Sequence, residues 1–392
     1  MKKISIGCLL LLSVCTFAQE DQPNPVLTGA PFLRVSPDAR AGALGDMGAA
    51  TSTDAFSQYW NPAKYAFSKS YSGIAASYTP YMSGITDDVF LLNASYYTFL
   101  GQEERSTLSA SIYYFNIGEI ELTSLGANNQ IVSNGIAKPN EFSIDLSYGL
   151  RLTDNYSMAV TGRFIRSDLF NNIDDGTVQP ANTFAVDVSG FYQTPRHSWN
   201  NFEGRARAGF NISNIGPKLD YSNNEDNAAY LPTNLRIGAG YDFILDDYNT
   251  VAVTLEANKL LVPTPSWEVD ENGEYIEGSR YIPNKGVVEG IFSSFGDAPG
   301  GFGEEMKEFT WAASAEYSYN DVLFIRGGYF HESAMKGDRQ HLTLGAGLRY
   351  NSFGIDFSYL IPMSDTNNAL ENTLRYGLTW EFGGETNNNY DY

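Results

Sequence analysis

A strict alternation of apolar and polar residues, repeated along most of the chain, constrains the fold more than any other feature. In the stretch FSIDLSYGLRL, Phe142, Ile144 and Leu146 alternate with Ser143 and Asp145. This period of two is typical of a β-strand, whose successive side chains point to opposite faces of a sheet. We count fourteen such runs, near residues 70–80, 88–99, 105–117, 140–152, 155–167, 180–195, 204–214, 233–245, 248–259, 308–319, 322–331, 340–350, 353–362 and 371–382.

The connections between the runs alternate between short and long. One set is mostly as brief as GQEER, TDN, DDY, YND and NS, whereas the other includes 118–139, 215–232 and 260–307. Outer-membrane barrels combine short periplasmic turns with long outer loops, and a water-soluble sandwich has no reason to do so. We therefore predict an all-β fold, a transmembrane antiparallel β-barrel of about 14 strands over residues 70–382. An even strand number leaves both chain ends on the periplasmic side, with 383–392 as a polar periplasmic tail.

The first residues predict export. Lys2 and Lys3 precede an apolar run, and the small Ala18 suits cleavage after residue 18, so residues 1–18 are interpreted as a signal peptide. Both cysteines, Cys8 and Cys15, lie inside it. A lipoprotein anchor at Cys15 is the alternative, disfavoured by the bulky residue before that cysteine. We expect a multi-pass barrel in the outer membrane.

The composition limits the classes of molecule that the protein can bind. The net charge of −21 argues against nucleic acid, because binding to phosphates requires basic residues. Aromatic residues make up 14% and charged residues only 18%, which suits an aromatic belt in contact with outer-membrane lipid.

The polar face of the runs carries isolated charges, which would face the lumen of a barrel. An arginine on the lipid face would cost about 2–4 kcal/mol at mid-bilayer. We expect a salt-bridged lumen, with a charged conduction path as the alternative. The predicted lumen network comprises Arg151, Arg163, Arg236, Glu256, Glu316, Arg326, Arg349, Asp356 and Arg375.

Residues 19–69 do not suit a lipid-facing strand. They combine the small-residue run ARAGALGDMGAATS with the compact aromatic stretch DAFSQYWNPAKYAF. A barrel of about fourteen strands has a lumen too wide for its own side chains to fill. We therefore predict that this segment is a plug, or hatch, inside the barrel, with a motif formed by Phe56, Tyr59, Trp60, Asn61, Pro62 and Ala63.

The long loop 260–307 is too aromatic to be merely disordered. Exposed aromatic residues on an outer loop favour protein contact, and folding back over the pore is the alternative. The candidate partner-binding residues are Trp267, Tyr275, Tyr281, Phe292, Phe295 and Phe302.

No motif indicates catalysis, a cofactor or a metal centre. Of the three histidines, His197, His331 and His341, the last two flank one outer loop and are interpreted as exposed loop residues. A Ser-His-Asp site there, with a nucleophile such as Ser333, is the alternative. The loop Asn223–Asn227, NNEDN, could hold calcium weakly, although a solvated acidic loop is the simpler interpretation.

The stretch FLRVSPDARAGALGDMGAATSTDAFSQYWNPAKYAF, Phe32 to Phe67, resembles the N-terminal signature of PorV (LptO), the outer-membrane protein of type IX secretion systems. That family is similar in fold to the FadL fatty-acid transporters, whose hatch contains an Asn-Pro-Ala step matched here by Asn61, Pro62 and Ala63.

The resemblance implies a shuttle or adaptor rather than an enzyme. Such a protein would associate with the large translocon barrel (SprA or Sov), bind the C-terminal signal domains of secreted cargo, and pass them to the PorU-type sortase attachment complex at the cell surface. The alternative is a FadL-like transporter of hydrophobic small molecules. A lipopolysaccharide-modifying enzyme using His331 or His341 is a third hypothesis, which the shortage of histidines disfavours.

Overall fold

A computed structural model describes residues 23–82, 86, 88–125, 129–169, 179–222, 228–268, 270, 276, 278–364 and 373–386. The expected signal peptide, the candidate calcium loop Asn223–Asn227 and Tyr275 lie outside the described residues.

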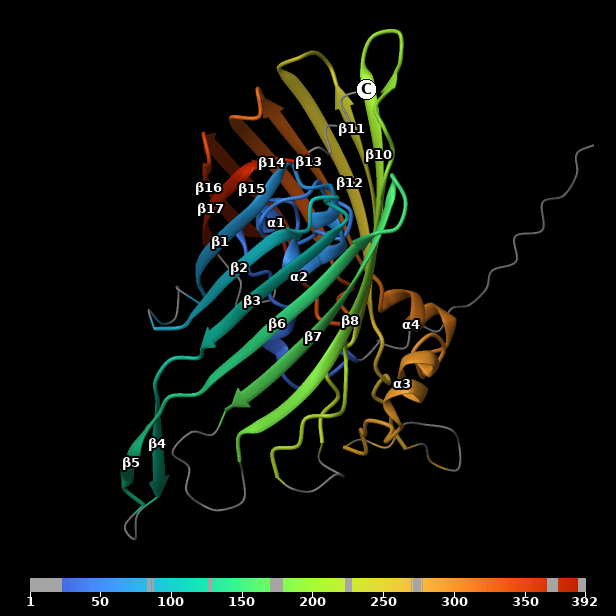
Figure 1. The fold of residues 1–392 in the computed structure, drawn as a ribbon. Helices are drawn as coiled ribbons and strands as arrows, with labels where there is room; N and C mark the ends of the chain where they lie inside the picture. The colour runs from blue at the N-terminus through green and yellow to red at the C-terminus, as the bar shows by residue number, and fades with distance from the viewer. Residues whose placement is uncertain are drawn as a thin grey trace, which may run out of the picture.

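The strands form a closed antiparallel barrel (Figure 1). The last strand pairs with the first, with Gly73 opposite Glu381. The fourteen predicted runs are confirmed, and each boundary lies within about three residues of its prediction. The barrel strands are β1 (Ser70–Pro80), β2 (Phe90–Leu100), β3 (Ser106–Asn116), β6 (Asn140–Arg151), β7 (Tyr156–Asp168), β8 (Ala181–Gln193), β10 (Glu203–Ile215), β11 (Asn234–Ile244), β12 (Asn249–Leu260), β13 (Thr310–Tyr319), β14 (Leu323–His331), β15 (Gln340–Tyr350), β16 (Phe353–Pro362) and β17 (Leu374–Glu385).

The barrel wall is apolar on its outer face and polar on its inner face, the reverse of a water-soluble protein. On β6, the side chains of Ile144, Leu146 and Tyr148 point outward and are exposed, whereas Asp145 and Ser147 point inward and are buried. An apolar outer face with a polar inner face is the pattern of a barrel that spans lipid.

The connections differ in length at the two ends, as predicted (Figure 1). At the long-loop end, the 118–139 connection forms the hairpin β4 (Ile120–Leu125) and β5 (Ile131–Ala137), and the 260–307 connection contains α3 (Val287–Ser293) and α4 (Phe302–Lys307). At the short-turn end, the longest connection carries the two-residue strand β9 (His197–Ser198). Within the described ranges, no helix is long and apolar enough to cross a membrane.

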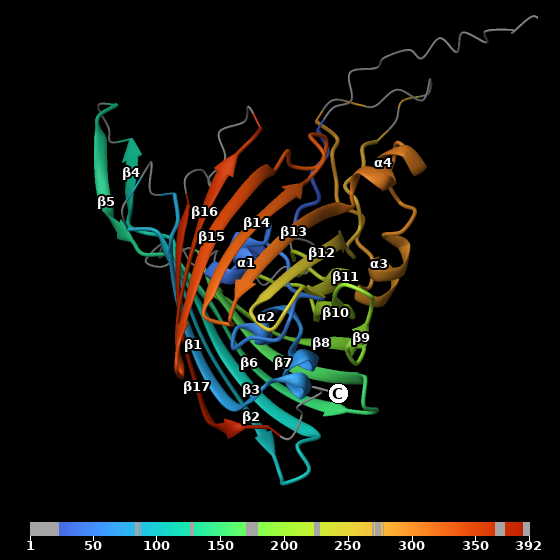
Figure 2. The ribbon, with the colours of Figure 1, turned by 90° about the horizontal axis from the view of Figure 1, so that it is seen from above.

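Residues 24–69 lie inside the barrel (Figure 2). They contain the short helices η1 (Pro31–Arg34), α1 (Ala39–Ala43), α2 (Ser57–Trp60) and η2 (Pro62–Phe67). The segment crosses the lumen lengthwise, because the backbone N–H of Asn24 donates to the carbonyl of Met335 (2.7 Å) at the long-loop end, while Ser70 begins β1 at the other end. As predicted, the first barrel strand begins and the last one ends at the short-turn end. The described part of the N-terminal segment, however, starts at the long-loop end.

Small residues let this segment approach the wall. A Cβ atom added to Gly48 would collide with the ring of Trp60, and one added to Gly209 on β10 would collide with the backbone of Ala49. Only glycine, which has no Cβ, permits such close packing. The small-residue run therefore matches the narrow space between the segment and the strands.

Candidate functional site

The aromatic knot joins the N-terminal segment to itself and to the barrel wall. The indole Nε1 of Trp60 donates to Asp38 (2.7 Å), whose other carboxylate oxygen accepts from the backbone of Ala41 (2.7 Å) at the start of α1. The Tyr59 hydroxyl donates to the carbonyl of Leu33 (2.7 Å). Phe56 packs with Tyr65, Ala75 and Tyr97.

Asn61 links two turns of the segment to a strand. Its amide nitrogen donates to the carbonyls of Ala49 (2.8 Å) and of Gly190 on β8 (3.0 Å). Its side-chain oxygen accepts from the backbone of Ala63 (3.1 Å) and so caps η2, where Pro62 fills the first position. The Asn-Pro-Ala step thus fixes a bend and binds the wall at the same place.

Several lumen charges are paired across neighbouring strands. Arg163 on β7 lies between Asp145 on β6 (2.7 Å) and Asp187 on β8 (3.0 Å), and all three side chains are buried. Arg207 on β10 binds Asp242 on β11 (2.6 Å) in the same way.

A second chain of charges connects the wall with the N-terminal segment. Arg326 binds Asp356 (2.6 Å) and also contacts Glu316, and Arg349 binds the other oxygen of Asp356 (2.7 Å). Glu316 in turn accepts two hydrogen bonds from Arg40 of α1, at 3.0 and 3.2 Å. The sequence singled out the wall residues, whereas the segment supplies the completing cation.

Three further residues of the predicted network also contact or face the segment. Arg375 binds Asp46 (2.8 Å), and Glu256 accepts from the backbone N–H groups of Gly48 (3.0 Å) and Ala49 (2.7 Å). The Arg236 guanidinium lies over the rings of Tyr59 and Trp60 instead of on a carboxylate. Arg151 is only half-buried at the short-turn end of β6, away from these clusters.

The outer-loop aromatic residues lie mostly in contact with solvent. Phe292 on α3 and Phe302 on α4 are 75% and 79% exposed, and Phe295 and Tyr281 are about half exposed. Trp267 is partly buried beneath the guanidinium of Arg280.

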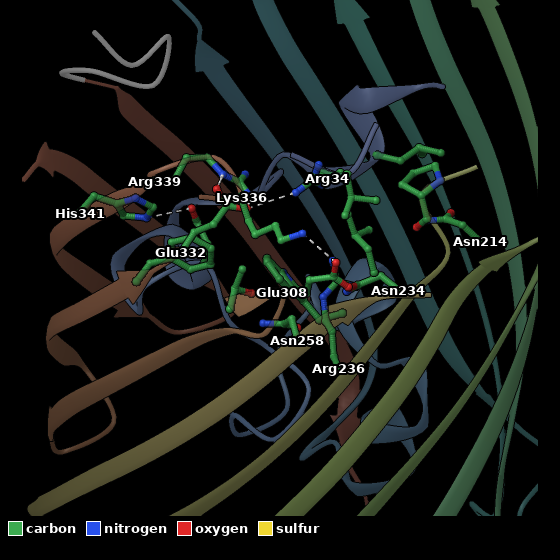
Figure 3. Close-up of a pocket in the computed structure, with 18 residues that line it drawn as sticks. Arg34, Asn214, Asn234, Arg236, Asn258, Glu308, Glu332, Lys336, Arg339 and His341 are labelled. Carbon is green, nitrogen blue, oxygen red and sulfur yellow. Dashed lines mark hydrogen bonds and ion pairs between the residues drawn. The ribbon is translucent and has the colours of Figure 1, made fainter. Parts of the chain in front are cut away.

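Between the N-terminal segment and the long-loop end of the barrel lie two adjoining recesses. The smaller recess, about 80 Å³, is lined by charged and amide side chains from the segment, the strands and the loop 332–339, together with apolar ones such as Leu33, Trp60 and Phe330 (Figure 3). The larger recess, about 360 Å³, has an apolar wall on one side. Both recesses share six lining residues, namely Val26, Arg34, Asp46, Glu332, Lys336 and Arg339.

Ion pairs hold the mouth of the recesses together. Glu332 binds Arg339 through both carboxylate oxygens (2.7 and 2.9 Å), and Arg34 lies 3.6 Å from the same carboxylate. Burial opposes ionisation of Glu332, but Arg339 and Arg34 outweigh it and lower the pKa of this carboxyl group. Burial and the charge of Arg339 lower the pKa of Arg34 to about 10.

A second set of buried charges anchors α4. Lys336 binds Glu304 (2.6 Å) and Glu308 (2.9 Å), while Lys259 at the end of β12 binds Glu305 and Glu308 (both 2.6 Å). The sequence did not identify these residues, because the pairs join segments far apart in the chain. The available signal was only that several charges cluster within 304–308 and 332–339.

The interpretation of the histidines as exposed loop residues is wrong for His341. This residue is buried, stacks on Phe330 with ring centroids 4.9 Å apart, and places Nε2 3.3 Å from Asp46. His331 is half-buried beside Trp311, and His197 is exposed on β9. Alternate residues of β15 face inward, and His341 is one of them, which explains why it is buried.

Comparison with protein-family models identifies the family of this chain. The model of the type IX secretion system protein PorV matches residues 17–267, which is more than half of the 392-residue chain. The chain belongs to the PorV family. It is therefore an outer-membrane component of type IX secretion, and the resemblance noted in the Phe32–Phe67 stretch is confirmed.

A comparison with curated proteins gave no significant match. Among solved structures, the Pseudomonas putida toluene transporter TodX is similar with 10% identity and a TM-score of 0.50, covering 89% of this PorV-family chain and 99% of TodX. The Ralstonia pickettii toluene transporter TbuX has 12% identity and a TM-score of 0.48, covering 90% and 99% of the two chains. A Pseudomonas aeruginosa FadL homologue has 11% identity and a TM-score of 0.43, covering 92% of this chain and 100% of the homologue. At such low identity, the similarity to TodX shows a common fold and nothing about ligands.

Proposed function

We propose that the protein is a plugged adaptor, which binds the C-terminal signal domains of secreted cargo at a SprA-type translocon and passes them to a PorU-type sortase complex. One observation carries this proposal. The N-terminal segment occupies the lumen lengthwise, yet the long-loop mouth above it keeps open recesses and exposed aromatic side chains. Such an arrangement suits binding at the outer surface and does not suit conduction.

The exposed aromatic residues of α3 and α4 supply the surface for a large partner. Phe292 projects from α3 and Phe302 from α4, and the buried acidic residues of α4, Glu304 and Glu305, are held by Lys336 and Lys259. Large aromatic side chains on a fixed support lose little conformational entropy on binding, which is why such residues dominate the energy of many interfaces. We assign this face to the translocon and the recessed mouth to cargo.

A FadL-like transporter of hydrophobic small molecules is the second candidate, because the larger recess has an apolar wall containing Phe32, Val35 and Phe115. Against it stand the charged lining of the smaller recess and the paired lumen, which would force an apolar solute to pass buried ion pairs.

The test is a mild-detergent purification of a tagged chain, followed by mass spectrometry of retained proteins and lipids. The adaptor proposal expects a very large second barrel together with secreted proteins that share a C-terminal domain. A Phe292→Ser, Phe302→Ser double variant should lose the second barrel. The control Tyr350→Ser, which removes an equally exposed ring (74%) at the short-turn end, should retain it.

Two results would overturn the proposal. Retained fatty acids or other hydrophobic small molecules without protein partners would favour the transporter. Equal retention of the second barrel by the double variant and the control would remove α3 and α4 from the interface.

A further inference from the structure

Arg236 is a buried cation that forms no direct ion pair with any described residue. It is 8% exposed and points into the lumen from β11, where it lines the smaller recess. Among the described residues, no carboxylate lies within 4.0 Å of its guanidinium, which instead sits 5.1 Å from the ring centre of Trp60 and 5.3 Å from that of Tyr59. The nearby carboxylate of Glu256 attracts Arg236 without direct contact, because it turns one oxygen to the backbone of the N-terminal segment, while its other oxygen has no hydrogen-bond partner among the described residues. A buried charge normally needs a partner, so this one is available to a ligand.

Arg34 adds a second, incompletely neutralised cation to the same recess. Within the described ranges, Arg34 has one ion-pair contact, with Glu332 at 3.6 Å, and both oxygens of that carboxylate already bind Arg339 at shorter distances. The guanidinium groups of Arg34 and Arg236 thus face one recess (Figure 3). Its lining contains four cations, Arg34, Arg236, Lys336 and Arg339, and three carboxylates, Asp46, Glu308 and Glu332, which leaves an excess of one positive charge. In a chain with a net charge of −21, such an excess of positive charge is local and specific.

The side chain next to Arg236 requires a hydrogen-bond donor. Asn258 lies directly opposite Arg236 on β12, and its buried oxygen Oδ1 has no hydrogen-bond partner in the part of the chain that the structure describes. An unsatisfied buried acceptor costs free energy that a ligand N–H group would recover. A fatty acid offers a carboxylate but no such donor, whereas a polypeptide offers both.

The larger recess has room for the rest of a ligand whose anionic group lies in the smaller recess. It adjoins the smaller one through Arg34 and has a volume of about 360 Å³, within the range of ligand pockets. Its wall includes the apolar side chains of Phe32, Val35, Tyr81 and Phe115, beside the loop 332–339.

From this geometry we infer that the paired recesses bind the free α-carboxylate of a polypeptide, with Arg236 and Arg34 holding the carboxylate and Asn258 accepting from a backbone N–H near the chain end. The residues before the terminus would lie along the apolar wall. The inference deepens the proposed function, on which it rests, by assigning the end of the cargo chain to this site.

The experiment uses the full-length protein in detergent and two labelled ten-residue peptides. Both carry the last ten residues of a secreted protein that copurifies with the barrel, one ending in a free carboxylate and the other in an amide; decanoate serves as a lipid probe. Because a hydrogen bond to a charged group is worth more than a neutral one, the free acid should bind about tenfold to a hundredfold more tightly than the amide. That preference should disappear in Arg236→Gln.

Matched variants separate the contacts. Arg349→Gln removes a lumen arginine paired with Asp356, outside the recesses, and should leave both affinities unchanged. Asn258→Leu should weaken the acid and the amide peptides alike without affecting decanoate. Heat-modifiable migration on gels verifies that each variant barrel is folded, and Arg236→Lys, which keeps the charge, should restore part of the preference if Arg236→Gln proves unstable.

Three outcomes overturn the inference. Equal binding of acid and amide would show that the recess does not recognise a carboxylate, while leaving the adaptor function intact. Binding of decanoate alone, dependent on Arg236, would assign the site to a lipid carboxylate. Failure of both peptides to bind a barrel that still retains cargo would place the cargo contact elsewhere.

Discussion

Arg40→Met should loosen the N-terminal segment within the barrel. Arg40 lies on α1, is buried, and donates to Glu316 on β13 (3.0 and 3.2 Å), to the Ser52 carbonyl (2.9 Å) and to Asp54. Methionine keeps the apolar stem but leaves Asp54 and Glu316 without this cation.

The magnitude follows from the partners that remain. Breaking a buried ion pair from one side costs about 3–5 kcal/mol. Glu316 keeps Arg326, so we take the lower value, and about 3 kcal/mol corresponds to roughly a hundredfold shift toward the undocked segment.

Hydrogen exchange measured by mass spectrometry detects this shift between the docked and undocked states of the segment. Amides of residues 39–52 should exchange roughly a hundredfold faster in the variant, while barrel strands remain protected. The control is Lys69→Met, which breaks a 2.9 Å pair with Asp321 whose side chains are 73% and 70% exposed. Such surface pairs contribute only about 0–1 kcal/mol. Unchanged exchange in Arg40→Met, or an equal change in the control, would refute the reasoning.

Two further predictions concern the seal and the lipid face. Replacing Trp60 and Asn61 by alanine removes the hydrogen bonds to Asp38 and to the β8 backbone, so the double variant should conduct more ions in planar bilayers; wild-type conductance would show that residues 24–69 do not seal the lumen. Leu146→Arg, at an outward position in the middle of β6, should lower the free energy of unfolding in lipid by about 2–4 kcal/mol, measured by urea titration against Leu146→Ala. A similar loss for both variants would mean that this face does not contact the hydrocarbon core.

The fold could be predicted because the strand signal is local. Each strand carries its own alternation, as between Leu146 and Ser147, and the loop lengths orient the barrel without any knowledge of pairing. The sequence did not predict the hairpin of β4 and β5, since nearly all of its side chains are exposed on both faces and no burial pattern marks it.

The site was only half predictable, since its partners converge from distant segments. Arg163 was identified as a lumen residue, but Asp145 and Asp187 meet it only after β6, β7 and β8 are set side by side. Arg34 and Arg339 are separated by most of the chain and share Glu332 through the fold alone. Periodicity reports which face a residue occupies, and it contains no information about which residues face each other across the lumen.

The same triad explains why the lumen carries ion pairs instead of apolar side chains. A slip of one residue between neighbouring strands turns every side chain to the opposite face. For β7, such a slip would place Arg163 in lipid, at about 2–4 kcal/mol, and would leave Asp145 and Asp187 buried without a cation. An apolar lumen would impose no comparable penalty, because apolar side chains are tolerated on the lipid face as well. We therefore infer that the buried charges of the wall discriminate against wrong registers more than they stabilise the correct one, and that the cations of the N-terminal segment, such as Arg40 on Glu316, extend the same discrimination to the docking of that segment.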